Sequence, residues 1–230
     1  MTTVLNGDLE LEGLFHEGRG PKDVPCLVCS PHPVFGGSMD SPICAELAWA
    51  ITRTGSATLR FNYRGVGASQ GRGHQTSPQA LEELSDLRAA AAQLRRTAGN
   101  ERVSLAGYSF GAWLASYVAA EPEFPIHRLV LVAPPINIMP FDFAALSARG
   151  VETAILAGQH DQYLDWDKLL EVGRLPRMRV EKIPDADHFF MRGLAQLGRL
   201  AANHVSDGAL GHEGDLELPE DDGPPLELDT

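Results

Sequence analysis

The sequence is poor in cysteine and has no long hydrophobic segment. Three cysteines occur among 230 residues, an odd number that fits a reducing compartment better than a disulfide framework. No apolar run approaches the roughly 20 residues that a membrane helix needs. The first residues lack the basic and hydrophobic regions of a secretory signal. We therefore expect a cytoplasmic protein that does not contact a membrane.

Basic side chains are also scarce. Lys and Arg number 19 against 31 Asp and Glu, so the net charge is −12, which argues against a nucleic-acid partner. Residues 206–230 carry nine of the acids, no Lys or Arg, and several Gly and Pro. Such a segment buries too little apolar surface to offset the entropy of ordering it. We expect one domain over residues 1–205 and a disordered acidic tail over 206–230.

Two motifs that could indicate a redox or cofactor site lack the necessary context. The Cys26-Leu27-Val28-Cys29 segment lies in an apolar run typical of a strand, where side chains three positions apart point to opposite faces. We expect these cysteines, and Cys44 on a helix face, to be small core residues. The segment 65–71 has Gln70 where a dinucleotide fingerprint requires Gly, and no helix begins there. No histidine and carboxylate grouping has metal-ligand spacing, so we expect neither a metal nor a cofactor.

Short runs rich in Val, Leu and Ile alternate with helical patterns along the chain, which indicates a mostly parallel α/β sheet with helices on both faces. Edge strands are expected within 5–16, and further strands at 26–29, 57–63, 102–107, 129–132, 153–157 and 179–183. Helices are expected at 42–54, 77–98, 109–120, 166–172 and 189–205. About twenty residues separate the strands at 129–132 and 153–157, which leaves no room for a cap domain.

The strongest local motif is Gly107-Tyr108-Ser109-Phe110-Gly111, which matches G-x-S-x-G with a strand before it and a helix after it. A serine at such a tight turn is held in a strained conformation above the sheet edge. The helix that follows directs its positive end toward this position. The alternative is a Gly-bordered turn with an incidental serine, but the flanking elements favour a nucleophile.

A serine hydroxyl needs a base to take its proton and a third group to orient that base. Asp161 follows one later strand and His188 follows the next, at the edge where open α/β sheets build their sites. Asp165 is the alternative acid, although Asp161 is closer to its strand.

Other titratable residues are weaker candidates for these roles. Asp185 and Asp187 are expected to be loop or helix-capping residues. The remaining histidines lie near strand ends, in loops, late in the last helix or in the tail, and are His16, His74, His127, His160, His204 and His212.

Three further segments carry a resemblance to a known family. Residues 30–39 resemble an H-P-H-P-x-x-G-G-S-M loop, residues 59–69 an R-F-N-x-R-G-V-G-x-S segment, and residues 187–190 a final D/S-H-F-F. With the G-x-S-x-G elbow at residues 107–111, the sequence resembles the α/β-hydrolase superfamily, in particular its small lidless bacterial serine hydrolases, over roughly residues 9–205. The resemblance implies Ser109 as nucleophile, His188 as base and Asp161 as the orienting acid.

The resemblance also implies an oxyanion hole of two backbone N–H groups. One would come from Phe110, and the other from His32, because Pro33 has no N–H; Val34 is the alternative donor. The family pattern begins this loop with His, whereas this chain has Ser30.

Apolar side chains cluster in the loops expected at this edge. We expect a substrate-binding wall from Phe35, Met39, Tyr108, Met139 and Phe189. The sequence thus predicts a serine hydrolase that forms an acyl-enzyme from a small ester, thioester or related acyl compound. The alternatives are an amidase or peptidase for small substrates, and a catalytically silent binding module with the same fold. The acyl chain, the leaving group and the oligomeric state stay open.

Overall fold

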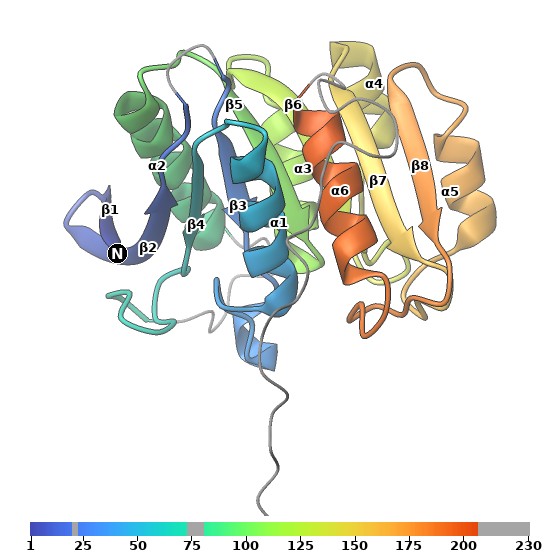
Figure 1. Ribbon diagram of the computed structural model, residues 1–230, viewed down its shortest axis with the longest axis horizontal. Helices are drawn as coiled ribbons and strands as arrows, with labels where there is room; N and C mark the ends of the chain where they lie inside the picture. The colour runs from blue at the N-terminus through green and yellow to red at the C-terminus, as the bar shows by residue number, and fades with distance from the viewer. Residues whose placement is uncertain (20–22, 73–80, 207–230) are drawn as a thin grey trace, which may run out of the picture.

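The computed structural model describes residues 1–19, 23–72 and 81–206 (Figure 1). The predicted tail from residue 207 onward and the predicted helix start at residues 77–80 lie outside the described residues. No helix in the described ranges is long and apolar enough to cross a membrane.

An eight-stranded sheet runs through the molecule in the order β1-β2-β4-β3-β5-β6-β7-β8 (Figure 1). The first two strands pair antiparallel and β2 is antiparallel to β4, whereas β3 to β8 are mutually parallel. The strands are β1 (Thr2–Asn6), β2 (Leu9–His16), β3 (Cys26–Cys29), β4 (Thr58–Phe61), β5 (Val103–Tyr108), β6 (Ile126–Val132), β7 (Glu152–Gly158) and β8 (Met178–Ile183). The predicted mostly parallel sheet is confirmed.

Helices cover both faces of this sheet, as predicted. One face is packed by α1 (Pro42–Arg53) and α6 (Leu194–Val205). The other is packed by α2 (Leu81–Ala98), α3 (Phe110–Ala120), α4 (Phe143–Arg149) and α5 (Trp166–Val172). Two apolar layers therefore sandwich the sheet, and the central strands β3 and β5 are buried along their whole length.

The cysteines are core residues. Cys26 packs in the layer under α1 and α6, and Cys29 packs in the opposite layer. Burial raises the pKa of the Cys44 thiol to about 12 and that of Cys26 still further. All three thiols are free and buried, so the C-x-x-C pair diverges across the strand as predicted.

Two helices differ from the sequence prediction. Helix α4 was not predicted, although Asp142 caps it by accepting from the Ala145 N–H and Gly150 ends it in a left-handed conformation. Helix α6 begins at Leu194 instead of residue 189. The preceding turn is closed by Asp187, and Phe190 and Gly193 have φ of 51° and 79°, which no right-handed helix allows. Between β6 and β7 the described chain holds only α4 and its loops, so the fold has no lid.

Candidate active site

Ser109 stands at the turn from β5 to α3, where the parallel strands end. Its φ of 53° and ψ of −113° lie outside the regions that a residue with a Cβ normally adopts. The Ser109 N–H donates to the Val132 carbonyl at the end of β6, at 2.9 Å. The strained turn is thus fastened to the neighbouring strand, which holds the hydroxyl at the sheet edge.

The two glycines of the motif are required by close approach of the backbone. A Cβ at Gly107 would lie 2.3 Å from the Gly111 carbonyl oxygen. A Cβ at Gly111 would lie 2.3 Å from the carbonyl oxygen of Cys29, in β3. Both distances are shorter than van der Waals contact allows, so the turn can be built only with glycine at these positions.

Ser109, His188 and Asp161 form one hydrogen-bonded chain. The His188 Nε2 is 3.1 Å from the Ser109 Oγ, and the His188 Nδ1 is 2.8 Å from the Asp161 Oδ2. His188 and Asp161 are 6% and 5% exposed. The second oxygen of Asp161, Oδ1, accepts from the Tyr163 N–H at 2.9 Å. Asp161 is therefore fixed by two bonds and can orient the imidazole.

Two tyrosines enclose the imidazole. The ring of Tyr163 packs edge-on at 4.7 Å, a contact that sequence analysis missed although Tyr163 is only two positions beyond Asp161. The Tyr108 hydroxyl donates to the His188 carbonyl at 3.2 Å, and burial raises the pKa of this phenol. The expectation that Tyr108 lines a substrate wall is not supported, because its side chain is buried and holds the His188 loop instead.

The competing acids have other partners. Asp165 caps α5, accepting from the Lys168 N–H at 3.1 Å, and this bond lowers the pKa of its carboxyl. Asp187 accepts from the Phe189 and Met191 N–H groups within its own loop. The predicted loop and capping role of Asp187 agrees with these bonds.

The loop after β3 brings His32 and Phe110 together. Its 3-10 turn η1 (Pro33–Phe35) follows His32, whose ring lies 4.5 Å from the Phe110 ring. The His32 Nδ1 accepts from the Val34 N–H at 3.2 Å, so this bond already engages the alternative oxyanion donor. Ser30 donates its hydroxyl proton to the Phe61 carbonyl at 2.9 Å and thereby ties the start of the loop to β4.

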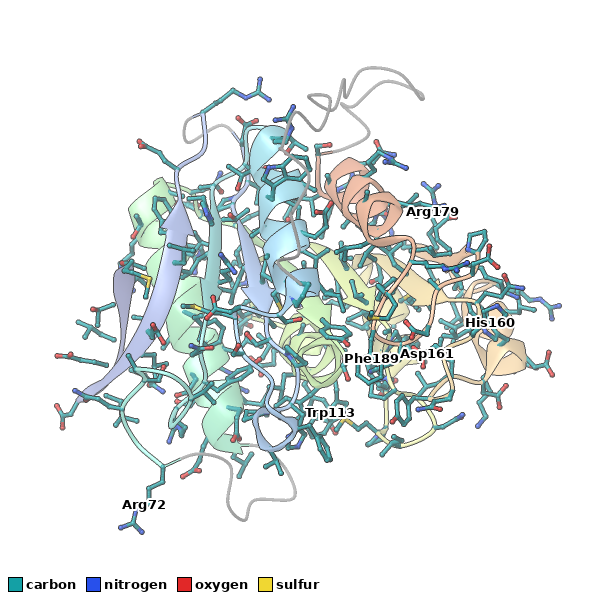
Figure 2. The ribbon with its side chains drawn as sticks, turned by 60° about the horizontal axis from the view of Figure 1, so that its bottom comes forward. Arg72, Trp113, His160, Asp161, Arg179 and Phe189 are labelled. Atoms are coloured by element: carbon teal, nitrogen blue, oxygen red, sulfur yellow. The ribbon has the colours of Figure 1, made fainter. Side chains whose placement is uncertain are left out.

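The residues expected to form a substrate wall differ in their exposure. Phe35 is 87% exposed. Phe189 is also exposed, and its ring centroid lies 5.4 Å from that of His188. Met39, by contrast, is only 2% exposed, so it packs inside the protein, and this burial does not support the prediction that it contacts substrate. Figure 2 shows Asp161 between Phe189 and His160, with His160 on the side toward α5.

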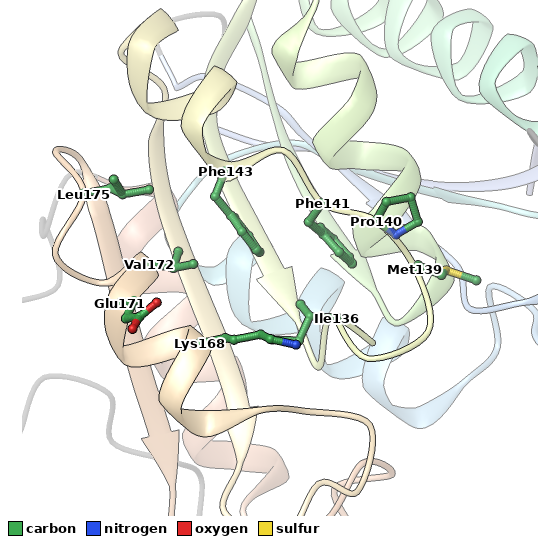
Figure 3. A pocket seen from close by; sticks show the side chains of 9 residues that line it. All are labelled: Ile136, Met139, Pro140, Phe141, Phe143, Lys168, Glu171, Val172 and Leu175. Atoms are coloured by element: carbon green, nitrogen blue, oxygen red, sulfur yellow. The ribbon is translucent and has the colours of Figure 1, made fainter.

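An apolar cavity of about 500 Å³ lies between the loop after β6 and helix α5 (Figure 3). Met139, one of the residues expected in the substrate wall, lines it, and Phe141 and Phe143 stack with their rings 7° from parallel. The Trp113 Nε1–H donates to the Pro140 carbonyl at 2.8 Å, which fixes this wall one helical turn beyond Ser109. The lining residues are Ile136, Met139, Pro140, Phe141, Phe143, Lys168, Glu171, Val172 and Leu175. Sequence analysis missed the contribution of α5.

Comparison with known proteins agrees with this geometry. A family model described as serine aminopeptidase, S33, within the α/β-hydrolases, matches residues 34–169. The chain belongs to the α/β-hydrolase superfamily. An uncharacterized protein of Rickettsia prowazekii is 32% identical over 190 residues, covering 78% of this chain and 77% of the relative.

Solved structures of bacterial α/β-hydrolases are also similar. A protein of unknown function from Agrobacterium tumefaciens superposes with a TM-score of 0.76 at 27% identity, covering 89% of this chain and 94% of that one. A serine hydrolase without a lid from Xanthomonas campestris gives 0.69 at 28% identity, covering 90% and 92%. The resemblance to small lidless serine hydrolases is confirmed. Within residues 1–19, 23–72 and 81–206, no three His, Cys, Asp or Glu side chains are grouped to hold a metal ion.

Proposed function

We propose that this protein is a carboxylesterase-like serine hydrolase, which cleaves an ester, thioester or related acyl bond of a small molecule. The observation that carries the proposal is the chain of two hydrogen bonds, at 3.1 and 2.8 Å, that links the Ser109 hydroxyl through His188 to Asp161. Its location on a strained strand-to-helix turn supports a nucleophilic role for the serine.

In the proposed reaction, His188 Nε2 takes the Ser109 proton as Oγ attacks the substrate carbonyl. The tetrahedral intermediate collapses, His188 returns the proton to the departing alcohol or thiol, and an acyl-enzyme remains. Water, activated by the same imidazole, then releases the acid and restores the Ser109 hydroxyl. Asp161 keeps the proton of neutral His188 on Nδ1, so that Nε2 can accept. These groups perform the reaction without a cofactor.

The negative oxygen of the intermediate is assigned to the backbone N–H groups of Phe110 and His32. Phe110 directly follows the nucleophile at the positive end of α3, and the packing of its ring on the His32 ring brings the two residues together. A donor of this kind contributes about 3 kcal/mol to stabilising the transition state.

The apolar cavity is the proposed site for the acyl group. Its volume of about 500 Å³ is within the range typical of small-molecule sites. It is lined mainly by hydrophobic side chains, with Lys168 and Glu171 as its charged members. We therefore expect apolar acyl groups to be preferred over charged ones.

The test uses wild-type protein and Ser109→Ala with p-nitrophenyl esters of increasing chain length and with acyl-CoA thioesters. We expect wild-type turnover, covalent labelling by a fluorophosphonate, and loss of both in Ser109→Ala, with kcat lower by about 10⁴-fold or more. Alanine fits the same turn, so the variant should stay folded. A variant that keeps most of its activity would show that Ser109 is not the nucleophile.

The matching family model is described as a serine aminopeptidase, so the experiment should also test hydrolysis of amide bonds. Aminoacyl p-nitroanilides should be assayed beside p-nitrophenyl esters of the same amino acids. Faster cleavage of the anilides would assign the site to amide hydrolysis. Labelling without turnover of any substrate would leave the acyl group unidentified, whereas absence of labelling would favour a silent binding module.

A further inference from the structure

We propose that Arg60 and Asn62, at the end of β4, are positioning residues that hold the oxyanion loop in register with Ser109. The proposal rests on the hydrolase function proposed above. It assigns a role to the R-F-N segment that the nucleophile, base and acid leave unexplained. The loop in question is residues 30–39, which contains the proposed oxyanion donor His32.

Both ends of this loop are fastened to β4. At the far end, the Asn62 Oδ1 accepts from the Met39 N–H and the Arg60 Nη1–H donates to the Met39 carbonyl, each at 2.8 Å. At the near end, the Ser30 hydroxyl donates to the Phe61 carbonyl at 2.9 Å. We call these three bonds the β4 clamp. Side chains thus bind both the N–H and the carbonyl group of Met39.

The segment between the two ends is itself a compact unit. The His32 carbonyl accepts from the Phe35 and Gly37 N–H groups, each at 3.1 Å, and Pro33 accepts from Gly36 at 3.0 Å. Gly37 packs so closely that a Cβ there would lie 2.4 Å from the Pro31 carbonyl oxygen. A loop with this internal bonding moves as one piece. Its position relative to Ser109 therefore depends on how its ends are held.

Asn62 is in turn fixed from behind. Its Nδ2–H donates to the Glu12 Oε2 at 2.8 Å, and the same oxygen accepts from the Ala68 N–H at 2.9 Å. Asn62 is buried, so its amide can satisfy both partners only in the observed orientation. Glu12 on β2 consequently sets the direction of the Asn62 amide, and through it the position of Met39.

The function of the clamp follows from the tolerance of oxyanion stabilisation. A backbone N–H stabilises the developing charge only at hydrogen-bond distance, and a misplacement near 1 Å can lower the rate by about 10²-fold. The clamp should therefore act on kcat with little effect on KM. The burial of Met39 has the same explanation, because its side chain anchors the clamped end of the loop in the protein interior.

The experiment compares Asn62→Ala, Arg60→Met and Asn6→Ala. Asn6 is the matched control, because its amide also donates to a carboxylate, that of the buried Asp86 at 2.8 Å, but it lies on β1 away from the loop. We expect Asn62→Ala to lower kcat for a p-nitrophenyl ester by about 10- to 100-fold with KM within about threefold. Arg60→Met should show the same pattern more weakly. Asn6→Ala should lower the melting temperature with kcat unchanged.

A rescue variant separates positioning from general damage. Asn62→Asp places a carboxylate against that of Glu12, so the two oxygens repel. Adding Glu12→Gln supplies a donor again, and the pair Asn62→Asp with Glu12→Gln should regain part of the lost kcat. If Asn62→Ala does not fold, Arg60→Met and this rescue pair carry the test.

Hydrogen exchange distinguishes failure of the clamp from failure of the proposed function. The peptide containing Met39 should exchange faster in Asn62→Ala than in wild type, whatever substrate is used. The proposal is overturned if the variants keep kcat within twofold of the Asn6→Ala control, if only KM changes, or if Met39 exchange is unaltered. If the wild-type protein cleaves no acyl bond, but the Met39 peptide exchanges faster in Asn62→Ala than in wild type, the hydrolase function is overturned and the clamp remains as an anchor of the loop.

Discussion

The strands on either side of β5 end in loops of different character. Toward β8, the loops present side chains to one another, as in the bonds of His188 with Asp161 and Ser109. Toward β1, side chains form hydrogen bonds to the backbone instead, as Asn62 and Arg60 do with the N–H and carbonyl groups of Met39. Ser109 lies at the boundary between these two halves of the sheet.

This difference separates two requirements of acyl transfer. Proton transfer depends on the chemical identity of a side chain, because only certain groups can accept and return a proton. Stabilisation of an oxyanion by backbone N–H groups depends on position alone. Substitution of His188 or Asp161 should therefore abolish the proposed chemistry, whereas substitution of Arg60 or Asn62 should weaken it in proportion to the displacement of the loop.

The largest expected effect within this comparison is at the acid. Asp161→Asn should lower kcat by about 10³- to 10⁴-fold, because the new amide can donate to His188 Nδ1 and stabilise the tautomer that cannot accept the serine proton. Asp165→Asn is the matched control and should stay within about twofold, since asparagine also caps helices well. Steady-state kinetics with one ester would decide. Equal losses at both positions would remove the distinction between the two carboxylates.

A smaller effect is expected at Val172, and it would show whether the β6–β8 half of the sheet edge selects the acyl group of the substrate. Val172 lines the cavity, whereas Leu170 on the same helix is exposed. Val172→Phe should fill the space of about two methylene groups and lower kcat/KM for a long acyl ester by about tenfold, at ~0.8 kcal/mol per methylene. Its activity on the acetate ester should be almost unchanged, and Leu170→Phe should alter neither. A uniform loss across chain lengths would place the acyl group elsewhere.

The smallest effect on turnover is expected at His204, which lies in the last turn of α6 and far from Ser109. Its substitution should change the free energy of unfolding and leave turnover unaltered. Burial lowers the pKa of His204 to about 4, although its ring bonds the Glu152 carbonyl at 3.2 Å. The unfolded chain, with an ordinary pKa of ~6.5, binds the proton first as the pH falls. The free energy of unfolding should therefore decrease between about pH 6.5 and 4, by at most about 3 kcal/mol from this residue.

His204→Gln should flatten that decrease while leaving kcat at pH 7.5 unchanged. The control is His160→Gln, because His160 is exposed, so the pair compares loss of a buried imidazole with loss of an exposed one. Denaturant unfolding at pH 7 and at pH 4.5 measures the effect. An unchanged slope in His204→Gln would show that other groups govern acid unfolding.

Local sequence patterns predicted the parts of the site that depend on local geometry. The elbow was recognisable because Gly107 and Gly111 flank a serine between a strand and a helix. Asp161 was preferable to Asp165 because it directly follows its strand. The proximity of Ser109 and Asp161 to His188 follows from parallel strands that end at one edge of the sheet. Helix α4 is equally local, since Asp142 and Gly150 are ordinary capping residues that mark its two ends in the sequence.

Residues whose role depends on distant partners were not predictable in this way. Met39 resembles an exposed loop residue, and only the bonds from Arg60 and Asn62 explain why its side chain turns inward. The orientation of Asn62 depends on Glu12, fifty positions earlier in the chain. The cavity unites the loop after β6 with α5, and periodicity indicates neither the gap between them nor its volume.

The contact of Gly111 with β3 has a consequence for redesign of the protein. With no Cβ, this residue lets the start of α3 touch the carbonyl oxygens of Cys29 and Ser30. The gap between Ser109 and the loop of residues 30–39 is therefore set by backbone contacting backbone, with no side chain available to adjust it. A site for a bulkier reaction centre could not be obtained by trimming residues around Ser109; it would have to be made by re-anchoring the loop at its far end, on β4.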